Sequence, residues 1–274
     1  MATEIAASCP PEIAQEIFLA GSVSRGWADE FSDLELNFIA DPIPTEEERN
    51  AWLGSIGADP IIPDSDWEPH GSQWVIFCYD GVWVEAGWHE PSQLLEAIEQ
   101  ILAGKGDPDR LAGALAYCIP LRPGPSLKQL RRRLSVYPKE LRAASIQREL
   151  RGWRFPHYLA GRRAMVERND SLQLAVLLLQ DCKSVLRVLF ALNHRWEPNF
   201  KWLSHIEDQL AIKPANLAER LESVLVGEEP HARVTAMLAL VRDTLALVEP
   251  SEERERALAI FSEQINGEPE SPGR

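Results

Sequence analysis

The first half of the chain alternates short apolar runs with amphipathic stretches. Four apolar runs have the length and residue types of strands, namely 17–20, 34–39, 73–79 and 82–86. The last two flank Asp80 and Gly81, a dipeptide that strongly indicates a tight hairpin turn. Apolar residues at helical spacing predict helices at 2–16, 45–56 and 91–104, the first of them interrupted or restarted at Cys9-Pro10-Pro11. The prolines between 57 and 71 indicate a loop, and 114–121 is expected to form a last strand.

From residue 126 onward the hydrophobic pattern is helical only. Helices are predicted at 126–135, 138–154, a segment ending at 167, 171–194, 201–210, 214–225, 230–247 and 251–266. The polar tail 267–274 is predicted to be disordered. We therefore predict an α+β fold, with a small mixed β-sheet and helices in residues 1–125 followed by an all-α helical bundle in residues 126–266.

Composition narrows the class of protein. The net charge of −14 argues against a general nucleic-acid binder, which needs a basic face, and favours cationic small molecules as partners. The four cysteines are scattered without a CxxC pair, so neither zinc nor a disulfide framework is expected. The chain shows no signal peptide and no apolar run of about 20 residues, so we expect a cytoplasmic protein that does not contact a membrane.

The stretch 17–39 carries the candidate chemistry. Asp33 and Glu35 are two residues apart in a predicted strand, so both side chains point to the same face. Two adjacent carboxylates are stabilised by a hard cation such as Mg²⁺, or else they form a solvated face. Gly21 and Ser22 follow a buried strand and have the residue types of an anion-binding turn, and Arg25 adds a planar cation. Together these residues suggest a site for a metal-bound triphosphate.

The order and spacing of these residues resemble a known family. Gly-Ser, ten residues and then Asp-x-Glu, within Gly-Ser-Val-Ser-Arg-Gly and Phe-Ser-Asp-Leu-Glu-Leu, is similar to the signature of DNA-polymerase-β-type nucleotidyltransferases. The likeness is greatest to the antibiotic-modifying branch that acts on kanamycin and lincosamides, which carries a helical C-terminal domain. The resemblance implies Mg²⁺-dependent transfer of a nucleoside monophosphate, with ATP or another NTP as donor, to a hydroxyl group with release of pyrophosphate. It suggests a role in antibiotic resistance.

The resemblance also implies roles for residues outside that stretch. A third carboxylate on a neighbouring strand corresponds to Glu85, which would complete the metal site or take the acceptor proton. The alternative is that Glu85 is an outward-facing residue of an edge strand. The residues expected to bind the triphosphate are Gly21, Ser22, Arg25, Ser32, Lys183 and Lys201.

The helical half offers further candidates. Lys183, Arg187 and His194 share one face of the apolar helix 171–194, and the resemblance assigns the phosphate-binding role to Lys183. Asp181 is a second candidate for the general base. The segment 193–203, which contains Lys201, resembles a corresponding segment of bacterial nucleotidyltransferases.

Several questions stay open at this point. Trp196 and Trp202 either stack on a base or belong to the core, and the core is favoured for both. The spacing from Arg187 to His194, like that from Arg151 to His157, also fits the HEPN ribonucleases.

The class of acceptor is open among aminoglycosides, lincosamides, other small hydroxylated metabolites and protein side chains. The rival functions are a non-catalytic nucleotide-binding or antitoxin-like protein and a protein-modifying adenylyltransferase. The sequence leaves the oligomeric state open, a homodimer included.

Overall fold

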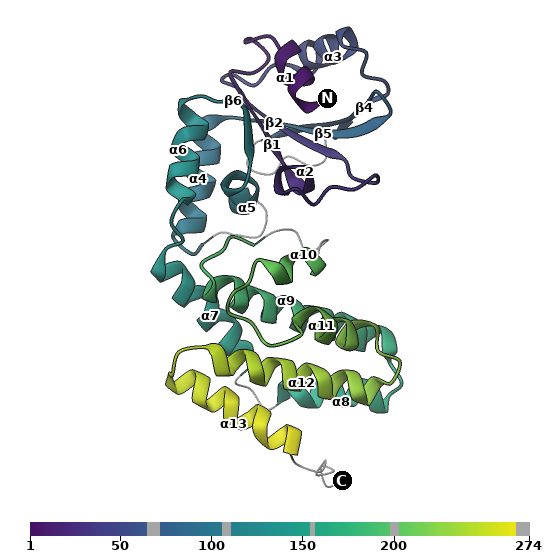
Figure 1. The fold of residues 1–274 in the computed structure, drawn as a ribbon, viewed down its shortest axis with the longest axis vertical. Helices are drawn as coiled ribbons and strands as arrows, with labels where there is room; N and C mark the ends of the chain where they lie inside the picture. Colours follow the sequence, from purple (N-terminus) through teal and green to yellow (C-terminus); the bar gives the residue numbers. More distant parts are fainter. Residues whose placement is uncertain (65–71, 106–110, 154–156, 198–202, 267–274) are drawn as a thin grey trace. The chain divides into compact units, whose positions relative to one another are not determined.

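A computed structural model describes residues 1–64, 72–105, 111–153, 157–197 and 203–266 (Figure 1). The chain divides into two compact units. The first contains residues 1–136 together with Trp196 and Glu197, and the second contains the described residues of 137–195 and those from 203 on. Each unit has a buried apolar cluster of its own, so the two are described separately.

The first unit is built on a mixed sheet of six strands in the order β3-β4-β5-β2-β1-β6. The strands are β1 (Glu16–Ala20), β2 (Leu34–Ile39), β3 (Ile61–Asp64), β4 (Gln73–Tyr79), β5 (Val82–His89) and β6 (Ile119–Arg122). The neighbouring strands β2 and β5 are parallel, and all other neighbours are antiparallel. The turn between β4 and β5 has positive φ at both Asp80 (50°) and Gly81 (78°), the geometry that the dipeptide predicts.

The two faces of the sheet differ in character. Leu36, Phe38 and Trp88 point to an apolar core together with Trp52, and the Phe38 and Trp88 rings stack with centroids 4.6 Å apart. Helices α1 (Ala2–Ser8) and α3 (Glu46–Ser55) lie on this side of the sheet (Figure 1). Because side chains alternate along a strand, Glu35 and the other residues between these core positions point to the opposite face.

Three helices pack together beside the β6 edge of the sheet: α4 (Pro91–Leu102), α5 (Leu111–Ala116) and α6 (Pro125–Leu134). The buried carboxylate of Glu16 accepts hydrogen bonds from the backbone N–H groups of Ser126 (2.8 Å) and Leu127 (2.7 Å), and so caps α6. Trp196 is buried, and its indole N–H donates to the Leu134 carbonyl over 2.9 Å. The core role that the sequence favoured for Trp196 is therefore confirmed.

The second unit is helical throughout its described residues. Its helices are α7 (Lys139–Trp153), α8 (His157–Glu167), α9 (Ser171–Leu192), α10 (Leu203–Asp208), α11 (Leu217–Val226), α12 (Pro230–Leu247) and α13 (Glu252–Asn266). The long α9 contributes Leu178, Val185 and Leu189, all fully buried, to the core of this unit. No helix within the described part of the chain is both long and apolar enough to cross a membrane.

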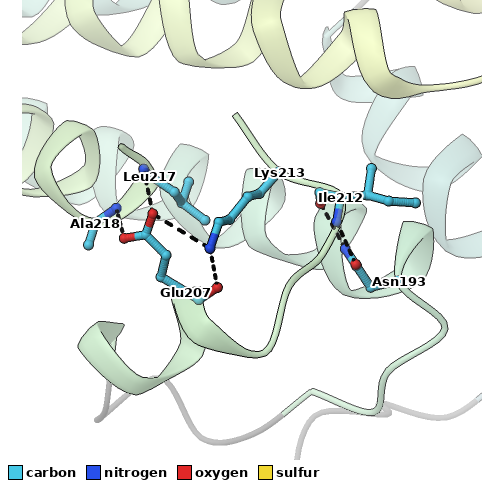
Figure 2. A network of polar contacts seen from close by, with 6 residues as sticks. All are labelled: Asn193, Glu207, Ile212, Lys213, Leu217 and Ala218. Carbon is cyan, nitrogen blue, oxygen red and sulfur yellow. Dashed lines mark hydrogen bonds and ion pairs between the residues drawn. The ribbon is translucent and has the colours of Figure 1, made fainter. Parts of the chain in front are cut away.

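Figure 2 shows how the connection from α9 to α11 is held. The Asn193 side chain, directly after α9, accepts a hydrogen bond from the Ile212 N–H and donates one to the Ile212 carbonyl, both over 2.8 Å. The Glu207 carboxylate of α10 accepts from the N–H groups of Leu217 (3.1 Å) and Ala218 (3.0 Å), the first residues of α11. A side chain from a neighbouring helix thus satisfies backbone donors that α11 leaves open at its N-terminus.

The predicted α+β fold, a mixed sheet with helices followed by helices alone, is confirmed. Some of the predictions for single elements are wrong. Of the helix expected at 2–16 only α1 forms, ending at Ser8 shortly before Pro10, and Glu16 already belongs to β1. The loop expected at 57–71 contains the strand β3, because an edge strand tolerates Pro63, whose missing N–H costs no ladder bond there.

The strand expected at 114–121 is the end of α5 followed by the shorter β6, since Leu-Ala-Gly-Ala-Leu-Ala is rich in helix formers. The tail 267–274 lies outside the described residues. The domain boundary at residue 125 stays a prediction.

Candidate functional site

The turn after β1 lies directly against the second of the two predicted acids. β1 ends at Ala20, and Gly21 opens the short helix α2 (Gly21–Arg25) with φ of +68°. A Cβ atom at Gly21 would lie 2.4 Å from Glu35 Oε1, so glycine favours the backbone conformation and leaves the Glu35 carboxylate in place. The Gly-Ser turn and the Asp-x-Glu strand therefore meet, although the turn and Glu35 are fourteen residues apart.

Two of the three predicted carboxylates, Glu35 and Glu85, lie on neighbouring strands of the sheet. Glu35 and Glu85 are partners in the parallel register of β2 and β5, and Ala20 of β1 is the partner of Glu35 on its other side. Glu35 and Glu85 point to the same face, and both are half-buried. Asp33, also half-buried, immediately precedes β2 and does not belong to the strand in which the sequence predicted it together with Glu35. The structure thus brings Glu35 and Glu85 into neighbouring positions, with Asp33 two residues before Glu35.

The carboxylates of the site suit a metal ion that is bound together with a nucleotide, and not one held by protein side chains alone. Among the described residues, no three His, Cys, Asp or Glu side chains are grouped so that they could hold a metal ion by themselves. Mg²⁺ usually needs one or two carboxylates, because substrate phosphates and water complete its octahedral shell. Glu35 and Glu85, with Asp33 nearby, therefore fit Mg²⁺ that arrives with a nucleotide.

Arg25 is held within the first unit by contacts on several sides. Its guanidinium lies over the rings of Tyr117 (4.1 Å to the centroid) and Trp27 (4.9 Å) and donates to the Gly113 carbonyl of α5 over 3.4 Å. Burial lowers the pKa of Arg25, while Tyr117 and then Glu35 favour its charged form. Arg25 is therefore a cation beside the Glu35 carboxylate as well as a link between α2 and α5.

The three serines of this region differ in their surroundings. Ser22 is buried within α2, and the Ser24 hydroxyl donates to the Gly21 carbonyl over 2.9 Å. Ser32 is half-buried, and its hydroxyl donates to Asp29 Oδ1 over 3.0 Å within the turn before β2. Ser24 thus stabilises the turn itself, a role that the sequence did not predict. Ser32 stabilises the loop between α2 and β2.

A buried polar layer next to the acids was missed in the sequence. His89 Nε2 and Asn37 Oδ1 are hydrogen-bonded over 2.8 Å, and both residues are almost fully buried on the face that carries Glu35. The Trp74 ring meets the His89 ring edge-on, with centroids 5.5 Å apart. A Cβ atom at Gly87 would lie 2.8 Å from Trp74 Cζ2, so this glycine makes room for both rings. The sequence did contain a signal for this pair. Asn37 is two residues after Glu35 and His89 four after Glu85, so each lies on the same strand face as the acid before it.

The candidates of α9 lie in the second unit. Asp181 is buried and accepts two hydrogen bonds from Arg162, to Oδ2 over 3.0 Å and to Oδ1 over 2.7 Å. A carboxylate held on both oxygens is poorly placed to take a proton from a substrate. Arg187 Nη1 lies 3.9 Å from Glu149 Oε1, so the basic face of α9 has an anionic neighbour within its own unit. Lys183 is half-buried on the same helix.

Two further predictions cannot be placed in the same way. Lys201 and Trp202 lie outside the described residues. The spacing from Arg187 to His194 was the one that fits the HEPN ribonucleases. In the structure His194 has a positive φ of 54°, and its ring centroid lies 6.3 Å from that of Tyr137. With Arg187 next to Glu149, nothing in this geometry singles out a ribonuclease site.

Comparisons with known proteins give distant likenesses. A family model described as a domain of unknown function, DUF4037, matches residues 121–203, which run from β6 to the start of α10. The chain is similar to the crystal structure of a nucleotidyltransferase-like protein from Exiguobacterium sibiricum, with 12% identity, coverage of 96% of this chain and 78% of that chain, and a TM-score of 0.42. The comparison with curated proteins gave no match. Likenesses this distant do not identify a substrate or a reaction, which have to be inferred from the site's own residues.

Proposed function

We propose that this protein is a Mg²⁺-dependent nucleotidyltransferase that transfers the AMP group of ATP to a hydroxyl group of a small acceptor. The observation that supports it is the convergence of three sequence elements at one end of the sheet. Gly21 lies against Glu35, and Glu35 is the register partner of Glu85. A turn with anion-binding residue types next to paired carboxylates is what transfer from a metal-bound triphosphate requires.

In the proposed reaction the acceptor hydroxyl oxygen forms a bond to the α-phosphorus of ATP. The bond from that phosphorus to the oxygen bridging to the β-phosphorus breaks, and pyrophosphate leaves on the opposite side. Glu85 takes the hydroxyl proton, since it is the carboxylate farther from the Gly21 turn. The triphosphate is held at Gly21 and Ser22, with Ser32 in the neighbouring loop.

The residues that would hold Mg²⁺ are Asp33 and Glu35, and Glu85 is the base rather than a metal ligand. When bound, Mg²⁺ offsets the negative charge of the phosphates and of the developing transition state. Arg25 reinforces the site through its place beside Glu35 and need not leave its contacts to do so. The proposal also keeps the phosphate-binding roles of Lys183 and Lys201 as the sequence predicts them.

Incubation with α-labelled ATP, Mg²⁺ and a panel of hydroxylated acceptors tests the proposal. We expect label transfer with release of pyrophosphate, lowered about 100-fold or more in Asp33→Ala, Glu35→Ala and Glu85→Ala because each removes charge stabilisation at the reacting centre. Glu47→Ala serves as the matched control, because Glu47 is an exposed glutamate of α3, the helix on the opposite side of the sheet. Transfer that survives in all three variants would contradict the proposal.

The second candidate is a non-catalytic nucleotide-binding protein of antitoxin-like character. It is favoured by one observation, that no three-ligand metal group is present among the described residues. The two candidates differ in a direct measurement. Binding of ATP with Mg²⁺ but no transfer to any acceptor, water included, would support the non-catalytic protein. Transfer to a protein side chain in the panel would identify an adenylyltransferase that modifies proteins.

A further inference from the structure

The face that carries the acids continues as an apolar surface on the strands beyond β5. Across the sheet, Glu85 of β5 is the partner of Ile76 on β4, and Ile76 is the partner of Ile62 on β3. Two residues closer to the hairpin turn, Trp83 of β5 is the partner of Cys78 on β4. All these side chains alternate with core positions such as Val84 and therefore point to the same face as Glu85.

Two large apolar residues of this surface are exposed to solvent, on neighbouring parts of the same sheet face. The exposed fraction is 49% for Trp83 and 46% for Ile62, and Ile76 and Cys78 are half-buried between them. A contiguous apolar patch on a folded protein commonly marks a binding site, and a tryptophan provides a large flat surface for a ring. We call these four residues, Ile62, Ile76, Cys78 and Trp83, the apolar platform.

The strand order places the platform and the Gly21 turn on opposite sides of the acids. Going across the sheet, β1 ends at the Gly21 turn, β2 and β5 carry Glu35 and Glu85, and β4 and β3 carry the platform. In an in-line displacement the acceptor and the leaving group lie on opposite sides of the phosphorus. If pyrophosphate leaves on the side of the Gly21 turn, the acceptor approaches from the side of Trp83.

We propose that the apolar platform is the binding surface for the acceptor, and that the acceptor is a small molecule with an apolar ring next to its reacting hydroxyl. This inference rests on the function proposed above. The ring lies on the Trp83 indole and against Ile62 and Ile76, and the hydroxyl then lies beside Glu85. A purely polar polyhydroxylated acceptor would leave this apolar surface in contact with water, so the platform selects against it.

Fluorine NMR of protein labelled with 5-fluorotryptophan tests the inference, since the Trp83 resonance is the one that disappears in Trp83→Phe. The probes are 4-nitrophenyl β-glucoside and methyl β-glucoside, which share their sugar hydroxyls and differ in the apolar ring. Both are titrated in the presence of Mg²⁺ and the non-hydrolysable nucleotide α,β-methylene-ATP. We expect the nitrophenyl glucoside to shift the Trp83 resonance at a concentration at least about tenfold lower than the methyl glucoside, because stacking and burial of the ring add to its affinity.

Variants test whether ring binding depends on the apolar platform or on any exposed apolar residue of the first unit. Because Trp83→Ala and Trp83→Phe lack the Trp83 resonance, their affinities are measured by isothermal titration calorimetry. Trp83→Ala is expected to weaken binding of the nitrophenyl glucoside about tenfold, and Trp83→Phe much less, since phenylalanine keeps a flat ring. Val136→Ala is the matched control, because Val136 is an apolar residue of the same unit that is 72% exposed and lies outside the sheet. Equal responses to the two glucosides, or unchanged affinity in Trp83→Ala, would overturn the inference.

Failure of the inference and failure of the proposed function are distinguishable by nucleotide binding, measured with fluorescent etheno-ATP. If etheno-ATP binds with Mg²⁺ and depends on Asp33 and Glu35 while the nitrophenyl ring does not perturb Trp83, the platform is refuted and the nucleotide site stands. If etheno-ATP does not bind the wild-type protein at all, the proposed function is refuted and the acceptor platform with it.

Discussion

Gly21 is the residue at which backbone conformation and site chemistry meet. Replacement by alanine puts a Cβ atom at a φ of +68°, which costs about 1–2 kcal/mol of stability. That Cβ atom would also lie 2.4 Å from Glu35 Oε1. A carboxylate at the end of a flexible side chain moves away at little cost, so the contact displaces Glu35 more than it destabilises the fold. We expect Gly21→Ala to weaken binding of Mg²⁺ and etheno-ATP at least about tenfold.

Gly26→Ala is the control for this prediction. Gly26 has a nearly identical φ of +72°, but no atom lies within 4 Å of the position that its Cβ would occupy. The two variants should therefore lose similar free energies of unfolding in urea denaturation, while Gly21→Ala alone loses nucleotide affinity. Equal losses of affinity in both variants would show that backbone strain, and not the displacement of Glu35, disturbs the site.

The cysteines provide a chemical probe of the apolar platform. Burial raises the pKa of Cys9 and Cys118 to about 11, and that of Cys182 to about 12. A pKa two units above the ordinary thiol value of 9.0 lowers the thiolate fraction about 100-fold at pH 8. Cys78 is half-buried, so we expect iodoacetamide to modify Cys78 first, as mass spectrometry of tryptic peptides can follow. Fast modification of a buried cysteine would contradict this account.

The residue scale also shows what sequence spacing can predict. The period of two predicts which residues of one strand share a face, because alternation is a property of any strand. It does not predict that Glu85 is the register partner of Glu35, since that depends on how β2 and β5 pair. It does not predict the ring contacts of Arg25 or the bond between Asn37 and His89, since these depend on how separate elements pack.

At the scale of single elements, a helix is fixed to the sheet by one buried carboxylate. Glu16 of β1 accepts from the N–H groups of Ser126 and Leu127 at the start of α6, and Gly124 leaves the room for it. Glu16→Ala leaves both buried donors without this acceptor, and we expect a loss of about 2 kcal/mol in the free energy of unfolding. The exposed Glu12→Ala should change it little in the same urea titration. A Glu16→Ala protein as stable as wild type would show that water replaces the cap.

A second cap gives a dependence on pH. The Glu229 carboxylate accepts from the N–H groups of Ala232 and His231 at the start of α12, and these bonds lower the pKa of Glu229 from its ordinary 4.5. A group whose pKa is lowered in the folded state stabilises the fold above its unfolded pKa, and this contribution is lost as the pH falls through the folded pKa. The stability difference between wild type and Glu229→Ala should therefore be constant above about pH 5.5 and shrink below pH 4.5.

Urea titrations of the two proteins at each pH measure that difference. The other carboxylates titrate equally in both proteins, so their contribution cancels. A difference that grows toward acid pH would mean that Glu229 does not act through its ionised form.

Elements with strong local signals were predictable and elements made by tertiary pairing were not. The hairpin of β4 and β5 and the capping box at Thr45 and Glu48 follow from residue types at fixed offsets. β3 does not, because Pro63 indicates a loop in the sequence, and only its place on an edge strand of the sheet makes a proline acceptable there.

At the scale of the whole molecule, the sequence predicts an α+β part followed by an all-helical part. It does not predict which later segments pack back onto the first unit. The change from strands to helices near residue 125 is visible in the hydrophobic period. The assignment of Trp196 and Glu197 to the first unit is not, since it depends on contacts such as the Trp196 bond to Leu134, made across more than sixty residues of sequence. Long-range packing of this kind carries no local signature.

The charge of the whole chain predicts how metal and nucleotide depend on each other. ATP without a metal brings further negative charge to a chain of net charge −14, at a site with Asp33, Glu35 and Glu85. Mg²⁺ offsets both sets of charges, so α,β-methylene-ATP should bind weakly in EDTA and tightly with Mg²⁺. A ligand at about 100 times its Kd stabilises the folded protein by about 2.7 kcal/mol, so Mg²⁺ with the nucleotide should raise the Tm by several degrees.

EDTA alone should leave the Tm unchanged, because the described residues contain no group that holds a metal without a nucleotide. Differential scanning fluorimetry measures these shifts, with KCl at matched ionic strength to separate specific Mg²⁺ binding from screening. A Tm that falls in EDTA would indicate a resident structural ion. Equal nucleotide binding with and without Mg²⁺ would mean that the carboxylates do not act through a metal. Since Gly21 and Glu35 are in contact, Gly21→Ala should lose the Mg²⁺-dependent shift and keep the screening effect of KCl.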